Sequence, residues 1–275
     1  MERDESAPQP DASTEIRFND GAAYERFMGV WSQRVGDVFL DWLRPAKGLR
    51  WLDVGCGNGA FTEQIVTQCA PAAVHGIDPS EAQLAFARQR PATAMAHYRT
   101  GDAMALPYAA SAFDIAVMPL VLFFVPDPFV GVQEMARVVQ PGGTVCAYVW
   151  DMEGGGFPYA ALHAEMRTLG LPVPMPPHPE ASRLDVLREL WTRAGLEAID
   201  AREITVQRTF ESFDDYWTTI KGGPSMGPAM ATAPLEALEQ LAARMRRCLP
   251  IDSNGGMTYE ARAHAIAGKV ARASD

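Results

Sequence analysis

Three glycines at alternate positions, Gly55, Gly57 and Gly59, follow a short apolar run that contains one acid, Asp53. A glycine turn directly after a strand bends the chain sharply and brings backbone N–H groups close to a ligand. The spacing is GxGxG, whereas dinucleotide-binding enzymes use GxGxxG to hold a pyrophosphate. A carboxylate at position 53 would repel a pyrophosphate, but it could hold an ammonium group directly or through water. The pattern therefore disfavours a pyrophosphate ligand.

Two further acids follow apolar runs downstream of this turn. Asp78, in HGIDPS, ends the next expected strand, where a carboxylate can accept hydrogen bonds from both hydroxyls of a ribose. The alternative is that Asp78 only caps the helix that begins near Ser80. Asp102, in GDAMALPY, follows a third expected strand; its carboxylate could accept from an exocyclic amine, and the N–H of Ala103 could donate to a ring nitrogen. A Gly-Asp pair by itself is usually a turn, so Asp102 gains weight only as the third acid in the series.

Alternating strands and helices must position these residues. We expect strands at residues 50–54, 73–77, 96–100, 115–118 and 144–150, and helices at residues 60–70, 80–90 and 128–139. Short apolar strands that alternate with helices predict a parallel sheet covered on both faces. The fold class is therefore α/β with a doubly wound, mostly parallel sheet, in which ligands bind at the carboxyl ends of the strands.

The regions around this core divide the chain as follows. Residues 1–18 are polar and are expected to form a disordered tail, and residues 19–275 a single domain. Within it, residues 19–48 are N-terminal cap helices, 49–150 the ligand-binding core and 151–275 an acceptor-side region. Residues 211–249 are a helical insertion between the last two expected strands, 197–210 and 259–270. This insertion is either a lid that moves at the glycines of GGP, residues 222–224, or a fixed helical layer.

Composition excludes several classes of partner. The 275-residue chain has a net charge of −10 and no basic run of five residues, so nucleic acid is not an expected partner. The four cysteines form no CxxC pair and no metal-ligand spacing with histidine, which predicts free thiols in a reducing cytoplasm and no metal site. The longest apolar run, residues 115–125, is too short to cross a bilayer, and the N-terminal residues are charged and polar. The expected location is cytoplasmic, without membrane insertion.

The series WLDVGCGNGAFTE, HGIDPS, GDAMALPY, SAFDIAV and ARVVQPGGT resembles the class I S-adenosylmethionine-dependent methyltransferases. More narrowly, it resembles their small-molecule branch, which includes the ubiquinone and menaquinone biosynthesis methyltransferases. The resemblance implies a seven-stranded sheet whose last strand is antiparallel, S-adenosylmethionine as cofactor and S-adenosylhomocysteine as product. Such a cofactor has no phosphate and carries an ammonium group, which fits Asp53.

The resemblance also implies cofactor contacts by position. Gly55, Gly57 and the turn around them would border the methionine part, Asp78 would hold the ribose, and Asp102 with Ala103 the adenine. Further expected cofactor contacts are Asn58, Pro79, Gln83 and Gly101. Met118, Pro119 and Leu120 would lie beside the methyl group, and Tyr24, Met28 and Trp31 would close over the cofactor. For those last three, ordinary core packing is an equal alternative.

Methyl transfer from a sulfonium requires an aligned acceptor and the exclusion of water, and a general base is optional. Among five histidines, His163 is the best candidate for a base, although a solvated helix histidine is the favoured interpretation. Phe123 and Phe124 make the loop after the fourth strand apolar, and MPLV stands where amino-group methyltransferases carry an Asn-Pro-Pro-Tyr type motif. The expected acceptor is therefore an apolar or aromatic small molecule.

Two other functions remain open from the sequence. The chain could bind the cofactor as a regulatory protein without turnover, because no convincing base is found. It could also be an NAD-dependent oxidoreductase on the same kind of sheet, which the GxGxG spacing and Asp53 disfavour. The sequence does not distinguish a monomer from a homodimer.

Overall fold

The structure is a computed structural model that describes residues 25–223 and 226–272. The expected tail, residues 1–18, and the expected cofactor contact Tyr24 lie outside the described residues. The first described elements are a π-helical turn, η1 (Glu25–Gly29), and helix α2 (Val30–Leu43).

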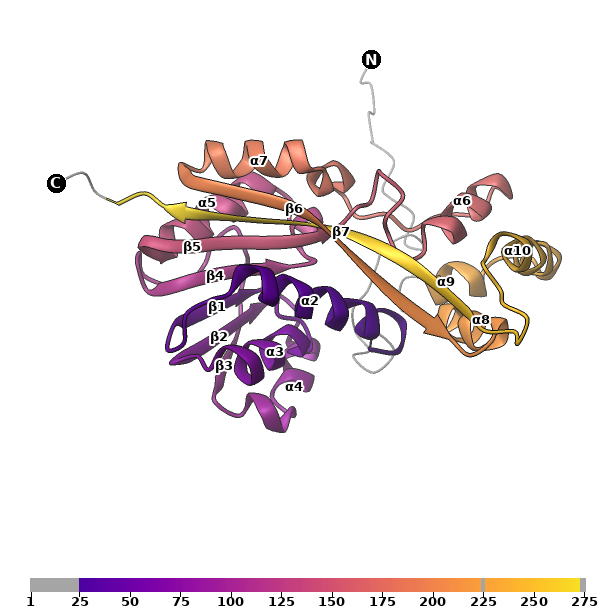
Figure 1. Cartoon of the computed structure of the whole chain (residues 1–275), viewed down its shortest axis with the longest axis horizontal. Coiled ribbons are helices and arrows are strands. Elements are labelled where there is room, and N and C mark those ends of the chain that lie inside the picture. The colour runs from indigo at the N-terminus through magenta and orange to yellow at the C-terminus, as the bar shows by residue number, and fades with distance from the viewer. Residues whose placement is uncertain (1–24, 224–225, 273–275) are drawn as a thin grey trace, which may run out of the picture.

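A single seven-stranded sheet forms the centre of the molecule (Figure 1). Its strands in sheet order are β3 (Ala96–Thr100), β2 (Ala73–Asp78), β1 (Arg50–Val54), β4 (Phe113–Pro119), β5 (Val139–Trp150), β7 (Met257–Val270) and β6 (Leu196–Phe210). Strands β1 to β5 pair in parallel, and β7 is antiparallel to both of its neighbours. The predicted doubly wound, mostly parallel sheet with an antiparallel last strand is confirmed.

Helices cover both faces of this sheet. On one face α2 packs against α3 (Ala60–Cys69), and on the other α5 (Pro128–Val138) packs against α7 (Leu184–Arg193). Helix α4 (Glu81–Ala87) contacts β2 and β3. The short helices η2 (Pro91–Thr93), η3 (Leu122–Phe124) and η4 (Pro179–Ser182) lie in connections. Burial on both faces explains why the central strands are apolar at consecutive positions.

Strand β5 begins earlier than the predicted residue 144. Its pairing with β4 starts at Val139, opposite Phe113, and shifts register before Ile115 pairs with Thr144. Gly142 lies in this irregular stretch with φ 78°, a left-handed conformation that glycine adopts without steric cost. The Pro-Gly-Gly sequence at residues 141–143 is therefore a bulge within a continuous strand.

The C-terminal third extends beyond the rest of the sheet. Strands β6 and β7 form a long antiparallel ribbon that carries α8 (Phe213–Lys221), α9 (Met226–Ala231) and α10 (Leu235–Cys248) at its far end (Figure 1). Helix α10 packs against α6 (Ala160–Thr168), which follows β5. The predicted helical insertion before the last strand is confirmed.

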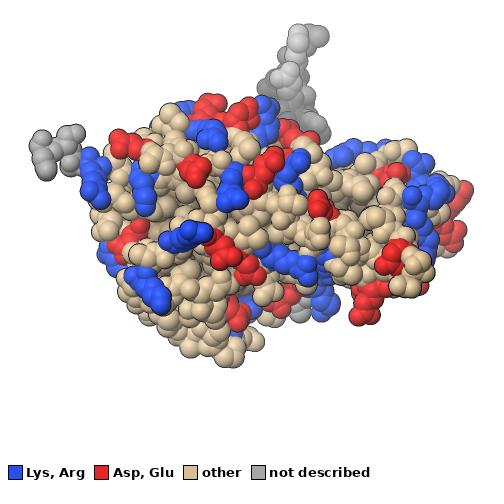
Figure 2. Space-filling view, in the orientation of Figure 1, with Lys and Arg blue, Asp and Glu red and all other residues tan. Residues whose placement is uncertain are grey.

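Charges on the face shown in Figure 2 are interspersed, with Lys and Arg beside Asp and Glu rather than gathered in one field. No helix among residues 25–223 and 226–272 is long and apolar enough to cross a membrane.

Candidate functional site

The glycine turn connects the end of β1 to the start of α3. Gly55, Gly57 and Gly59 have φ angles of 73°, 52° and 80°, a region that side chains with a Cβ rarely adopt. The N–H of Gly55 donates to the carbonyl of Ile77 on β2 at 2.7 Å. A Cβ on Gly55 would lie 2.5 Å from a methyl carbon of Val121, whereas a Cβ on Gly57 would meet nothing closer than 4.0 Å. The turn is therefore packed at Gly55 and has free space at Gly57.

Asp78 lies directly beside this turn, at the carboxyl end of β2. One carboxylate oxygen accepts from the N–H of Gly57 at 2.9 Å, and the other accepts from the N–H of Ser80 at 2.8 Å. The N-cap of α4 is Ser80 itself, whose hydroxyl accepts from the N–H of Gln83. The cap therefore does not account for Asp78, and each of its oxygens keeps a lone pair for a further donor. Burial raises the pKa of Asp78 above its ordinary value, while the two backbone bonds oppose that rise.

A cavity of about 650 Å³ opens at the carboxyl ends of the central strands, beside Asp78 and the turn. It brings together many of the residues predicted from sequence to contact a cofactor or a substrate. These are Met28, Gly55, Gly57, Asn58, Asp78, Pro79, Gln83, Pro119, Leu120 and His163.

Other predicted contacts do not line the cavity. Trp31 and Met118 are completely buried in the core, and the ring of Trp31 lies 5.2 Å from that of Tyr259. For these two residues the geometry is that of core packing. Gly101, Asp102 and Ala103 follow β3, where the carboxylate of Asp102 accepts from the N–H of Met104 in a turn. Their contact with an adenine stays a prediction.

Asp53 lies beneath the turn instead of facing the cavity. Its side chain is fully buried, and one carboxylate oxygen accepts from the hydroxyl of Thr62 on α3 at 2.7 Å. Burial raises the pKa of Asp53 to about 7; the bond from Thr62 opposes this rise and the nearby charge of Asp78 adds to it. In this geometry Asp53 connects β1 to α3, and its contact with an ammonium group stays a prediction.

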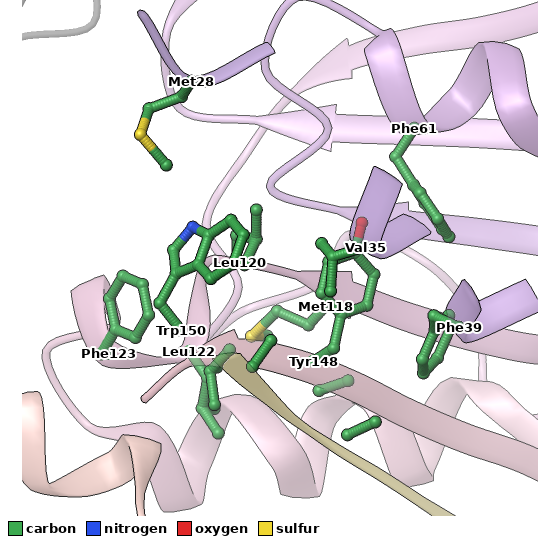
Figure 3. Packing of buried hydrophobic residues seen from close by; sticks show 14 of the residues in the cluster. Met28, Val35, Phe39, Phe61, Met118, Leu120, Leu122, Phe123, Tyr148 and Trp150 are labelled. Carbon is green, nitrogen blue, oxygen red and sulfur yellow. The ribbon is translucent and has the colours of Figure 1, made fainter. Parts of the chain in front are cut away.

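The other end of the cavity is apolar and aromatic. Its walls come from segments far apart in the sequence, and its aromatic members are Phe27, Phe61, Phe123, Phe124, Tyr148, Trp150 and Phe157. Figure 3 shows the indole of Trp150 near Phe123 and Leu120, with its nitrogen on the side toward Met28. Such walls favour a flat apolar ligand, because aromatic rings gain from stacked and edge-on contacts.

His163 belongs to this apolar end. It lies on α6 with 5% of its surface exposed, lines the cavity, and has its ring 5.1 Å from that of Phe157. The interpretation of His163 as a solvated helix histidine is wrong, because this side of α6 faces Phe157 and the cavity. Burial, with a smaller effect of the nearby Arg167, lowers the pKa of His163 to about 4. The imidazole is therefore neutral at pH 7.

The structure also adds lining residues that sequence reasoning missed. Ser32, one turn after Met28 on the N-terminal helices, has a buried hydroxyl without a hydrogen-bond partner among the described residues. Helical spacing from Met28 could have identified it. Pro174 and Pro176 lie in one loop segment and Phe157 in another. Nothing local in those two segments signals a binding role.

Hydrogen bonds hold η1 against the apolar end. The carbonyl of Phe27 accepts from the hydroxyl of Tyr159 at 2.6 Å and from the guanidinium of Arg208 at 3.1 Å. The rings of Phe27 and Tyr159 stack at 4.4 Å. Because Phe27 and Met28 line the cavity, these contacts fix one of its walls.

The chemistry of the lining fits a nucleoside without phosphate. No residue that lines the cavity in the described chain is Lys or Arg, and its charged member at the turn is the carboxylate of Asp78. A pyrophosphate would meet this carboxylate without a compensating cation, whereas ribose hydroxyls can donate to it. Over the described residues, no group of three or more His, Cys, Asp or Glu side chains could hold a metal ion.

Comparisons with known proteins agree with this chemistry. Residues 52–147 match the family described as "Methyltransferase domain". The chain is 36% identical over 132 residues to demethylmenaquinone methyltransferase of Staphylococcus aureus, a match that covers 47% of this chain and 52% of that protein. The chain thus spans about half the length of the curated relatives it matches.

Solved structures share the fold at lower sequence identity. Phosphoethanolamine N-methyltransferase 2 of Haemonchus contortus, in complex with S-adenosyl-L-methionine, has a TM-score of 0.58 and 18% identity, covering 91% of this chain and 56% of that one. The [4+2]-cyclase SpnF has a TM-score of 0.58 and 22% identity, covering 87% of this chain and 81% of that one. The family match and the strand order lead to one conclusion: residues 52–147 form a methyltransferase domain, and the sheet has the fold of the class I S-adenosylmethionine-dependent methyltransferases.

Proposed function

We propose that this protein transfers a methyl group from S-adenosylmethionine to a small apolar or aromatic acceptor. The observation that carries the proposal is one cavity with two chemically different ends. One end presents Gly57 and the oriented carboxylate of Asp78, and the other presents an aromatic wall with His163. A nucleoside fits the first end and a flat apolar molecule fits the second.

In this proposal each end has a separate task. Asp78 accepts hydrogen bonds from the ribose hydroxyls while Gly57 and Ser80 hold its carboxylate in place. Asp102 and Ala103, after β3, bind the adenine. When bound, the cofactor supplies a methyl group already activated on a sulfonium. The aromatic wall excludes water and aligns the acceptor, which are the two requirements of the transfer.

Two alternative functions are a cofactor-binding protein without turnover and an oxidoreductase. The SpnF cyclase has the same fold, so the fold alone does not decide the reaction, and a cofactor-binding protein without turnover is possible. An oxidoreductase is disfavoured because a nicotinamide dinucleotide would place its pyrophosphate beside Asp78.

Calorimetric titration with S-adenosylmethionine, S-adenosylhomocysteine and NADH tests the first step. We expect both S-adenosyl compounds to bind and NADH to bind more weakly or not at all; preferred binding of NADH would overturn the proposal. Turnover is then measured as S-adenosylhomocysteine formed with demethylmenaquinone, the molecule in the name of the Staphylococcus aureus relative, and with simple hydroxyarenes. Cofactor binding without product from any acceptor would favour the regulatory alternative.

A further inference from the structure

The loop that follows β5, residues 151–157, lies where the ribbon of β6 and β7 leaves the rest of the sheet (Figure 1). Strands β5 and β7 pair as far as Ala263. One residue further along the ribbon, the N–H of Arg262 donates to the carbonyl of Gly156 at 2.8 Å, and the carbonyl of Arg262 accepts from the N–H of Asp151 at 3.0 Å. The loop therefore continues, for one more residue of β7, the backbone pairing that β5 ends.

An ion pair between Asp151 and Arg262 closes the loop. The side chain of Asp151 is 4% exposed, and one of its oxygens accepts from the Nε and Nη2 of Arg262 at 2.9 and 2.5 Å. Its other oxygen accepts from the N–H of Gly154 at 2.7 Å, and the Nη2 of Arg262 also donates to the carbonyl of Gly154 at 2.9 Å. A Cβ on Gly154 would clash with the carboxylate, and a Cβ on Gly156 would lie 2.7 Å from the Cβ of Arg262. The glycine-rich loop is thus wrapped tightly around one buried carboxylate.

The closed loop carries part of the aromatic end of the cavity. Met152 and Phe157 line the cavity, whereas Asp151 and Arg262 do not. The N–H of Phe157 donates to the carbonyl of Asp151 at 3.0 Å, so the position of Phe157 follows that of Asp151. The places of two wall residues therefore depend on an ion pair that lies outside the cavity.

The burial of Asp151 distinguishes this pair from its neighbours. The carboxylate of Glu203, on β6, lies 3.9 Å from the Nε of Arg262 but is 55% exposed, and both side chains of the Arg183–Asp185 pair are also exposed. Water screens such exposed pairs, so they contribute little. A buried carboxylate that loses its cation is left desolvated, and the structure around it must move to solvate it. Loss of the Asp151–Arg262 pair should therefore open the loop, and loss of the exposed pairs should not.

We propose that Asp151 and Arg262 are positioning residues for the acceptor: their ion pair holds Met152 and Phe157 in the wall against which the acceptor is aligned. The word acceptor rests on the proposed function, but the positioning of the wall does not depend on the cofactor. The two residues act only through the loop, because neither lines the cavity. The cavity end at Asp78 is held by separate hydrogen bonds, from Gly57 and Ser80, and is independent of this pair.

Two ligands test the proposal on the full chain. Equilibrium dialysis with naphthalene, a flat uncharged probe, reports on the aromatic wall, and calorimetric titration with S-adenosylhomocysteine reports on the end at Asp78. Asp151→Asn and Arg262→Met should each weaken naphthalene binding by about 10-fold and change the affinity for S-adenosylhomocysteine by less than about 2-fold. Hydrogen exchange of residues 152–157 should become faster in both variants, because the loop is no longer closed.

A conservative variant and two controls assign the effect to the pair. Arg262→Lys keeps the charge without the fork of N–H groups, so it should recover part of the naphthalene affinity that Arg262→Met loses. Glu203→Gln and Arg183→Met, which break the exposed pairs, should leave both affinities unchanged. If Arg262→Met does not fold, the comparison is made with Asp151→Asn, which keeps the size of the side chain.

The inference is overturned if the wild type does not bind naphthalene, or if Asp151→Asn binds it as tightly as the wild type. Equal weakening of both ligands would also overturn it, because the pair would then support the whole fold rather than the wall. Failure of the wild type to bind S-adenosylhomocysteine, with the naphthalene difference present, would overturn the proposed function and leave the positioning of the wall standing.

Discussion

The two ends of the cavity are built in different ways. At the end near Asp78, neighbouring turns supply every group, and the carboxylate is already fixed by two backbone N–H groups at 2.8 and 2.9 Å. At the aromatic end, segments far apart in the sequence meet, and Trp150 is left with an unpaired N–H among the described residues. The first end is preorganised by backbone hydrogen bonds at the ends of neighbouring strands, whereas the second depends on the packing of distant segments.

The largest expected effect comes from removing the carboxylate at the end of the cavity near Asp78. Asp78→Ala should weaken binding of S-adenosylhomocysteine by at least about 100-fold, because two charge-assisted hydrogen bonds of about 1.5–3 kcal/mol each are lost. Calorimetric titration measures the affinity, and Asp78→Asn, which keeps the shape without the charge, should fall in between. Unchanged affinity with an intact fold would remove Asp78 from the site.

The next largest effect is the pH dependence of stability that comes from the buried Asp53. Because the pKa of Asp53 is raised from 3.8 to about 7, the folded state holds its proton where the unfolded state has released it. The stability contributed by this proton is complete below pH 3.8 and is lost as pH rises through 7, a change of about 4 kcal/mol. Denaturant unfolding measures the free energy of unfolding of the wild type and of Asp53→Asn from pH 4 to 8. As pH rises, the wild type should lose stability relative to the variant. A difference that is constant across pH would contradict this.

The stability that depends on His163, at the aromatic end, should change with pH in the opposite direction. The pKa of His163 is lowered from 6.5 to about 4, so the unfolded state takes up a proton that the folded state refuses. The corresponding stability is present above pH 6.5 and is lost as pH falls toward 4, by about 3 kcal/mol. His163→Phe should remove this acid-side loss in the same unfolding series, and His178→Phe should retain it. Equal acid sensitivity in both variants would mean that His163 is not desolvated.

A smaller effect separates packing from binding within the glycine turn. Gly55→Ala and Gly57→Ala both add a left-handed strain of about 1–2 kcal/mol. Only Gly55→Ala also places a Cβ against Val121, so it should lower the free energy of unfolding by about 1–3 kcal/mol more. Gly57→Ala should lower the affinity for S-adenosylhomocysteine with the smaller loss of stability, because Gly57 lines the cavity and its added Cβ meets no neighbour closer than 4.0 Å. Equal losses of stability in the two variants would show that a Cβ at Gly57 is as crowded as a Cβ at Gly55.

The smallest expected effect concerns the insertion. Gly223 lies so close to the ring of Phe27 that an added Cβ would be 2.6 Å from it, which links the insertion to the cavity wall. Hydrogen exchange of α8 to α10 should slow by a few-fold when S-adenosylhomocysteine is bound, while β4 and β5 stay unchanged. Equal protection in both states, at the level of those strands, would identify the insertion as a static wall.

Sequence predicted the elements that depend on local patterns. The alternating apolar runs predicted the sheet. The glycine turn and Asp78 predicted one end of the cavity, because each is a short motif at a strand end and the parallel pairing of β1 and β2 brings these ends together. Met28 and Trp31 show the limit: both fit the same helical pattern, yet Met28 lines the cavity and Trp31 is in the core. That difference depends on which elements pack against each face of the helix, and helical periodicity does not identify them.

The aromatic end of the cavity could not be predicted from the sequence for the same reason. Pro174, Pro176 and Phe157 contribute to it because the path of their loops is set by contacts with distant elements. The direction of His163 also depends on how α6 packs with α10 and Phe157, so a solvated and a buried histidine look alike in the sequence.

The ribbon of β6 and β7 has a consequence for how such proteins diverge. Phe210 and Met257 pair across the ladder, so residues 211–256 leave and re-enter the fold at a single place. Loop closure at a fixed pair of ends costs little more for a longer segment than for a shorter one. The whole segment can therefore be exchanged or resized without moving β1 to β5, and the strand ends that line the cavity would stay in place.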